Sequence, residues 1–126
     1  MKTAKYECSL FGFVVLAAMC PADEFNAWVA KKFKTDELVP PHSYAATFYL
    51  SEKNIGHPIV VWMSPDAGGG CLAHECYHAA KRILARRGID VGDAGDPSGE
   101  VMAYLLGDMF KALCNGLWHG KMGARK

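Results

Sequence analysis

Hydrophobic residues in the first third of the chain change their spacing once, and the change predicts a strand followed by a helix. Segment 6–18 is rich in aromatic and β-branched residues, which favours a buried strand with a bend at Gly12. Beyond Pro21, which suits the first turn of a helix, large apolar residues recur on one helical face: Phe25, Trp28, Val29 and Phe33. We therefore expect a helix that starts near residue 21 and packs one face inward.

Two further apolar segments, 43–51 and 57–64, have the composition of strands. Residues 52–56 between them include asparagine and glycine, which favour a tight turn, so the two strands are expected to pair as an antiparallel hairpin. The segment 35–43 contains two prolines and breaks both the strand and the helix pattern. It is expected to be a loop.

The second half of the chain predicts two helices. The first covers about residues 71–87 and stops at Gly88, because glycine readily takes the left-handed conformation that ends a helix. The second starts near residue 96 or 98 and runs to about residue 117. The basic, glycine-rich residues 119–126 are expected to form a flexible tail. A chain of 126 residues fits one α+β domain, 1–126.

The composition says more about the compartment in which the protein works than about the reaction that it carries out. Of the residues, 51% are hydrophobic and 21% charged, and the formal net charge is +1, which points neither to nucleic acid nor to a membrane surface. Five cysteines occur without a CxxC pair, so reduced thiols in the cytoplasm are favoured over a disulfide framework. Residues 1–18 also have the layout of a secretory signal peptide, which is the alternative to the strand.

The segment HECYH, residues 74–78, places two histidines four residues apart on the first of the two predicted helices. Each residue of an α-helix advances by about 100°, so His74 and His78 point to the same side and can bind one ion. Glu75 lies beside that position and is the candidate general base for a metal-bound water, whereas Cys76 points almost opposite to His74. The spacing predicts a Zn²⁺ site with its own base; the alternative is an ordinary exposed or core histidine pair.

A catalytic zinc ion has three protein ligands and one open position, so a third ligand must come from elsewhere. Glu100, near the start of the last predicted helix, is the first choice. On the same face of that helix, Ala103 and Gly107 are small enough to let two helices approach. The alternatives for the third ligand are His119, Asp90, Asp93 and Asp96.

Two further residues of the last helix share the face of Glu100. Tyr104 is a candidate catalytic residue, because its hydroxyl could donate a hydrogen bond to a developing oxyanion. Asp108 could accept the free N–H of a ligand histidine and so fix its tautomer. His42 and His57 are expected to be loop and turn residues rather than ligands.

HECYH followed by GEVMAYLLGDM resembles the gluzincin zinc metallopeptidases, in which a later helix supplies a glutamate as third ligand. The resemblance is to minimal single-domain members: small phage-encoded metallopeptidase-like proteins and SprT-like or ImmA/IrrE-type domains. It covers residues 59–116 and implies that His74, His78 and Glu100 bind Zn²⁺ while Glu75 acts as base. Thermolysin-like members carry an aspartate four residues after the ligand glutamate, where this chain has Tyr104.

The fold implied by the resemblance is a small zincin-like α+β fold. In it a short, mostly antiparallel sheet packs on the HExxH helix and on a C-terminal helix that bears the glutamate. The strand 57–64 would be the sheet edge that lines the cleft, to which an extended peptide could add as a further strand.

Two functions are therefore expected as alternatives. The first is a zinc-dependent metallopeptidase that hydrolyses a peptide bond of a peptide or protein substrate with zinc-activated water and Glu75 as general base. The second is a non-catalytic zincin-fold module that binds a protein, such as a phage-type antagonist of a host protein. An intact Glu75 favours the enzyme, and the small size of the chain, without a substrate-binding lobe, favours the binding module.

Overall fold

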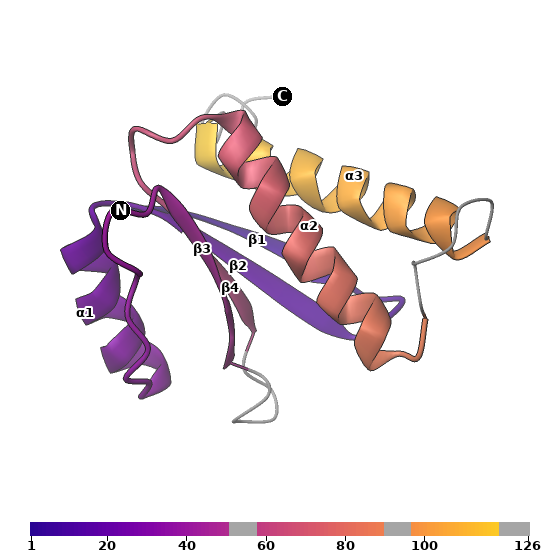
Figure 1. Ribbon diagram of the computed structural model, residues 1–126, viewed down its shortest axis with the longest axis horizontal. Helices are drawn as coiled ribbons and strands as arrows, with labels where there is room; N and C mark the ends of the chain where they lie inside the picture. The colour runs from indigo at the N-terminus through magenta and orange to yellow at the C-terminus, as the bar shows by residue number, and fades with distance from the viewer. Residues whose placement is uncertain (51–57, 90–96, 119–126) are drawn as a thin grey trace.

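The computed structural model describes residues 1–50, 58–89 and 97–118 (Figure 1). The described residues form a small α+β domain with one four-stranded sheet of strand order β1-β2-β4-β3. Two of the three strand pairings are antiparallel, and β2 pairs with β4 in parallel. The elements in chain order are β1 (Lys2–Cys8), β2 (Phe13–Met19), α1 (Ala22–Phe33), β3 (Ala45–Tyr49), β4 (Ile59–Met63), α2 (Gly69–Arg86) and α3 (Pro97–Trp118).

The first apolar segment is a hairpin, not the single bent strand expected over 6–18. The chain reverses after Cys8, and β1 and β2 pair antiparallel along their whole length. Gly12 has a φ of 73°, which favours glycine, and its N–H donates to the carbonyl of Cys8 at 2.8 Å. The turn residues Ser9 to Phe11 are mostly apolar, so the hydrophobic run continues through the turn. The sequence pattern therefore gives no sign that the chain changes direction here.

The predicted hairpin is confirmed, since β3 and β4 pair antiparallel with Thr47 opposite Val61. The turn expected at 52–56 lies outside the described residues. The expectation that segment 57–64 forms the sheet edge is wrong, because β4 lies between β2 and β3. All five residues of β4 are buried, as both faces of a central strand are covered. The edges of the sheet are β1 and β3.

Helices cover both faces of the sheet, with α1 on one side and α2 and α3 on the other (Figure 1). On the α1 side, the ring of Phe25 lies 5.4 Å from that of Phe48 and 6.1 Å from that of Trp62, centroid to centroid. The inward face expected for α1 is thus confirmed. On the other side, alternate strand residues such as Val15 and Val61 pack in one buried cluster with residues of α2 and α3.

The ends of the two long helices agree with the sequence-based expectation. After α2, Gly88 has a φ of 76° and donates its N–H to the carbonyl of Ala85 at 3.0 Å, while Ile89 donates to Leu84 at 2.9 Å. The last helix begins at Pro97, close to the expected start. Neither of these helices, nor α1, is long and apolar enough to cross a membrane. All five cysteines are free thiols.

Candidate functional site

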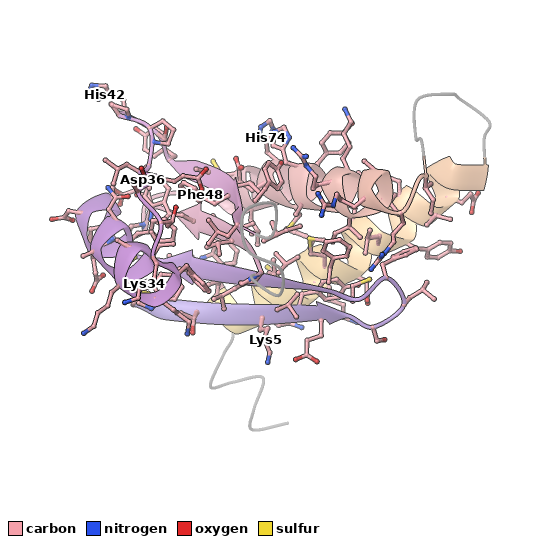
Figure 2. All side chains as sticks on the ribbon, turned by 90° about the horizontal axis from the view of Figure 1, so that it is seen from below. Lys5, Lys34, Asp36, His42, Phe48 and His74 are labelled. Atoms are coloured by element: carbon pink, nitrogen blue, oxygen red, sulfur yellow. The ribbon has the colours of Figure 1, made fainter. Side chains whose placement is uncertain are left out.

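The two histidines of HECYH lie together on the outer side of α2. Their Nε2 atoms are 3.0 Å apart, and the two rings stand nearly perpendicular, with centroids 4.6 Å apart. His74 is exposed and His78 half-buried. Figure 2 shows His74 projecting outward from α2. The prediction that the four-residue spacing brings two imidazole nitrogens to one point is therefore confirmed.

Glu75 points differently, because it sits about 100° further around the helix, on the side that meets β3. Its side chain is only 8% exposed, and it is the one charged residue that is buried among the described parts of the chain. Thr47, in the middle of β3, donates its hydroxyl to Oε1 of Glu75 at 2.6 Å. A buried carboxylate needs such a donor, since burial without a hydrogen bond is costly.

A shallow depression of about 330 Å³ opens beside these groups, between the start of β3 and the first turns of α2. His74 and Glu75 both line it. The remaining lining residues are Ser43, Tyr44, Ala45, Gly70 and Cys71. We call His74, Glu75 and His78, together with Thr47 and this depression, the HECYH site.

Sequence reasoning missed the contribution of β3 to the site. Thr47 and Tyr44 were read only as parts of a strand. The alternation of side chains along β3 could have indicated this contact. Thr47 is a polar residue on the face that Ala45 and Tyr49 share. The opposite face carries Ala46 and Phe48. A polar side chain on the face of a strand that packs against a helix needs a partner on that helix.

The third predicted ligand is not brought to the histidine pair. Glu100 is exposed on α3. Within residues 1–50, 58–89 and 97–118, no three His, Cys, Asp or Glu side chains are arranged to hold one metal ion. The alternatives that the sequence left open lie outside the described residues: His119, Asp90, Asp93 and Asp96. Two of the three expected ligands are therefore together, and the third stays a prediction.

Tyr104 and Asp108 line a different surface, a groove of about 660 Å³ between the β1–β2 hairpin and α3. Tyr104 is 76% exposed there. Asp108 accepts a hydrogen bond from the hydroxyl of Tyr6 at 3.0 Å, so its partner is a residue of β1 and not a ligand histidine. Burial and this hydrogen bond raise the pKa of the Tyr6 phenol well above its usual value. We call this surface the hairpin groove.

Close packing of α3 also occurs at a different glycine from the one expected. A Cβ on Gly107 would meet no atom within 4 Å, so that glycine does not allow a close helix approach. A Cβ on Gly116 would lie 2.4 Å from the Cβ of Ala4. The tight contact of α3 is therefore with β1 at Gly116.

Comparison with known proteins adds no relative, since no protein-family model, no curated protein and no solved structure matches the chain. The function must be inferred from the geometry of the HECYH site.

Proposed function

We propose that the protein is a small zinc-dependent metallopeptidase with a zincin-like fold, in which His74 and His78 bind Zn²⁺ and Glu75 is the general base. The observation that carries the proposal is the pair of Nε2 atoms 3.0 Å apart next to a buried carboxylate on the same turn of α2. His74 and Glu75 both line one depression, where a substrate could reach them.

The histidine pair fits a zinc ion as two of its ligands. Zinc–nitrogen bonds of about 2.0–2.1 Å at a tetrahedral angle place two nitrogens about 3.3–3.4 Å apart. The distance of 3.0 Å between the two Nε2 atoms is within a few tenths of that value. The sequence-based candidates for the third ligand are Glu100, which is exposed and not grouped with the histidines among the described residues, and His119 and the aspartates of the preceding linker. When bound, the metal would supply a Lewis acid that activates water and polarises a carbonyl.

Glu75 suits the role of the base because of where its carboxylate lies. It is buried beside His74 and within the depression, so a water molecule there would be next to a carboxylate shielded from bulk solvent. Such a carboxylate can take a proton from the attacking water and return it to the leaving nitrogen. A histidine pair that served only for packing would need no acid at this position.

The substrate we propose is an extended peptide or protein segment. Among the described residues β3 pairs only with β4, so its outer edge can accept a further strand. The depression starts at Ser43 and Ala45, at the beginning of that edge. A peptide added to β3 would therefore run past the HECYH site, which replaces the role that the sequence had assigned to segment 57–64.

The experiment compares the wild type with Glu75→Gln after loading with Zn²⁺, using casein and a proteome-derived peptide library as probes. Glu75→Gln is expected to retain zinc by elemental analysis and to lose hydrolysis, because an amide cannot accept the proton. Glu24→Gln, at an exposed position of α1, is the matched control and should behave as the wild type. Equal cleavage by the wild type and Glu75→Gln would contradict the proposal.

A second candidate follows from the number of ligands, since only two are together within the described part of the chain. A zincin-fold module that binds a protein without cleaving it does not need the three-ligand site of a catalytic zinc ion. In that case the wild type and Glu75→Gln would both bind a protein partner and neither would cleave it.

A further inference from the structure

We propose that Thr47 is the positioning residue for the general base, holding one oxygen of Glu75 so that the other faces the substrate. This inference rests on the proposed function, because a base needs positioning only if the site is catalytic. Thr47 touches neither the substrate nor the metal in this scheme and acts through Glu75.

The first support is the geometry of the contact. The Thr47 hydroxyl lies 2.6 Å from Oε1 of Glu75 and 3.4 Å from the carbonyl oxygen of the same residue. A hydroxyl has one proton to donate, and the shorter contact is in the range of charge-assisted O–H···O⁻ bonds. The proton therefore goes to the carboxylate, and Oε1 is fixed.

The second support is that Oε2 is left for the chemistry. Glu75 lines the depression, and its carboxylate accepts one hydrogen bond from the described residues, that of Thr47 to Oε1. Oε2 accepts none from these residues. One oxygen is anchored and the other is available to accept a proton.

The third support is the rigidity of the anchor. Thr47 sits in the middle of β3, in register with Val61 of the central strand β4. A side chain mounted on a paired strand is held more precisely than one on a loop. Because β3 is also the edge that would carry the peptide, Thr47 couples the orientation of the base to the strand along which the substrate would lie.

The functional test uses Thr47→Val, which keeps the shape of the side chain but removes the hydroxyl, and Thr47→Ser, which keeps the hydroxyl. On the library peptide that the wild type cleaves best, kcat of zinc-loaded Thr47→Val is expected to fall about 10- to 100-fold, with KM changed by less than about twofold. Thr47→Ser should stay within about threefold of the wild type. Thr3→Val, at an exposed strand position, is the matched control and should change neither constant.

A second readout needs neither metal nor substrate. Urea unfolding of the metal-free wild type, Thr47→Val, Glu75→Gln and the double variant forms a double-mutant cycle. The two substitutions should be non-additive, because Thr47→Val removes the donor of the hydrogen bond and Glu75→Gln replaces its charged acceptor with a neutral amide oxygen. If Thr47→Val does not fold, Thr47→Ala takes its place in both tests.

The outcomes separate the two proposals. A wild type that cleaves no probe overturns the proposed function and the positioning role with it, while the unfolding cycle still reports the hydrogen bond. A wild type that cleaves and a Thr47→Val variant that cleaves equally well overturn the positioning role alone. Failure of Thr47→Ser to restore kcat also overturns it, since the methyl group and not the hydroxyl would then matter.

Discussion

The HECYH site and the hairpin groove are built alike, each where an edge strand meets a helix, yet they differ in what they hold. At the first, β3 and α2 bring two imidazoles, a buried carboxylate and a hydroxyl together. The second lies between the β1–β2 hairpin and α3 and contains the hydrogen bond from Tyr6 to Asp108. Around this bond large side chains are exposed, with Leu10 at 83% and Tyr104 at 76%. Sequence reasoning had assigned candidate groups to both helices, and among the described residues His74, Glu75 and His78 of α2 lie together without Glu100. Spacing within one helix is a stronger guide to a site than a shared face on two helices.

The largest expected effect comes from removing a histidine. His74→Ala should weaken zinc binding by more than about 100-fold, since losing even a hydrogen-bond partner of a ligand costs about 10- to 100-fold. Glu100→Gln should have a much smaller effect, because Glu100 is exposed and is not grouped with the histidines. Both affinities can be measured by competition with a zinc-sensitive dye.

The control for this comparison is His42→Asn, at an exposed position with a φ of 62° that asparagine tolerates. Figure 2 places His42 on the loop between α1 and β3, apart from His74. If Glu100→Gln lost zinc as completely as His74→Ala, α3 would supply the third ligand after all.

The next largest expected effect is on the free energy of unfolding, through the packing of α3 on β1. Gly116→Ala should lower the free energy of unfolding by about 1–3 kcal/mol, because the new Cβ would overlap Ala4 of β1. Gly107→Ala is the matched control in the same helix, where the added methyl group meets nothing within 4 Å. It should raise stability by about 0.5–1 kcal/mol, as alanine favours a helix. Urea denaturation measures both, and equal changes would show that α3 does not pack on β1 as described.

A smaller effect is expected within the hairpin groove. Tyr6→Phe removes the hydrogen bond to Asp108 and should cost about 1 kcal/mol of unfolding free energy. Tyr104→Phe should leave stability unchanged, because its side chain is mostly exposed. It should also leave hydrolysis unchanged, since Tyr104 does not line the depression that His74 and Glu75 share. A large loss of activity in Tyr104→Phe would restore its predicted catalytic role.

The smallest signal is the ionisation of one phenol. The pKa of Tyr6 is raised, so its neutral form is favoured and it should remain un-ionised at pH 10, the ordinary pKa of a tyrosine side chain. An absorbance titration of the wild type and Tyr6→Phe should give the same amplitude around pH 10. A smaller amplitude in the variant at that pH would mean that Tyr6 is not buried against Asp108.

How far the sequence predicted the fold depended on how local the signal was. Helix α2 was predicted to within two residues at each end, because Gly88, which ends it, is a local signal. The reversal between β1 and β2 was missed, because an apolar turn does not interrupt the hydrophobic run. The central place of β4 had a signal, five consecutive apolar residues that are typical of a strand covered on both faces, but it was taken for an edge.

The candidate site likewise has one part that the sequence predicted and another part that it did not. The pairing of His74 with His78 was predictable, since four residues make about one turn of a helix. The anchoring of Glu75 by Thr47 was not, because the two are separated by 28 residues and meet only when β3 docks beside α2. The proposed third ligand required the relative placement of two helices, and no local pattern encodes that.

The contact of Gly116 with Ala4 joins the last turns of α3 to the first strand of the chain. Because β1 precedes α3 in the chain, a ribosome makes β1 well before the end of α3, so during synthesis this part of the sheet stays uncovered until α3 has emerged. We expect a nascent chain that lacks α3 to be a target for chaperones and to be sensitive to proteases, since the apolar face of the sheet that α3 buries would be exposed.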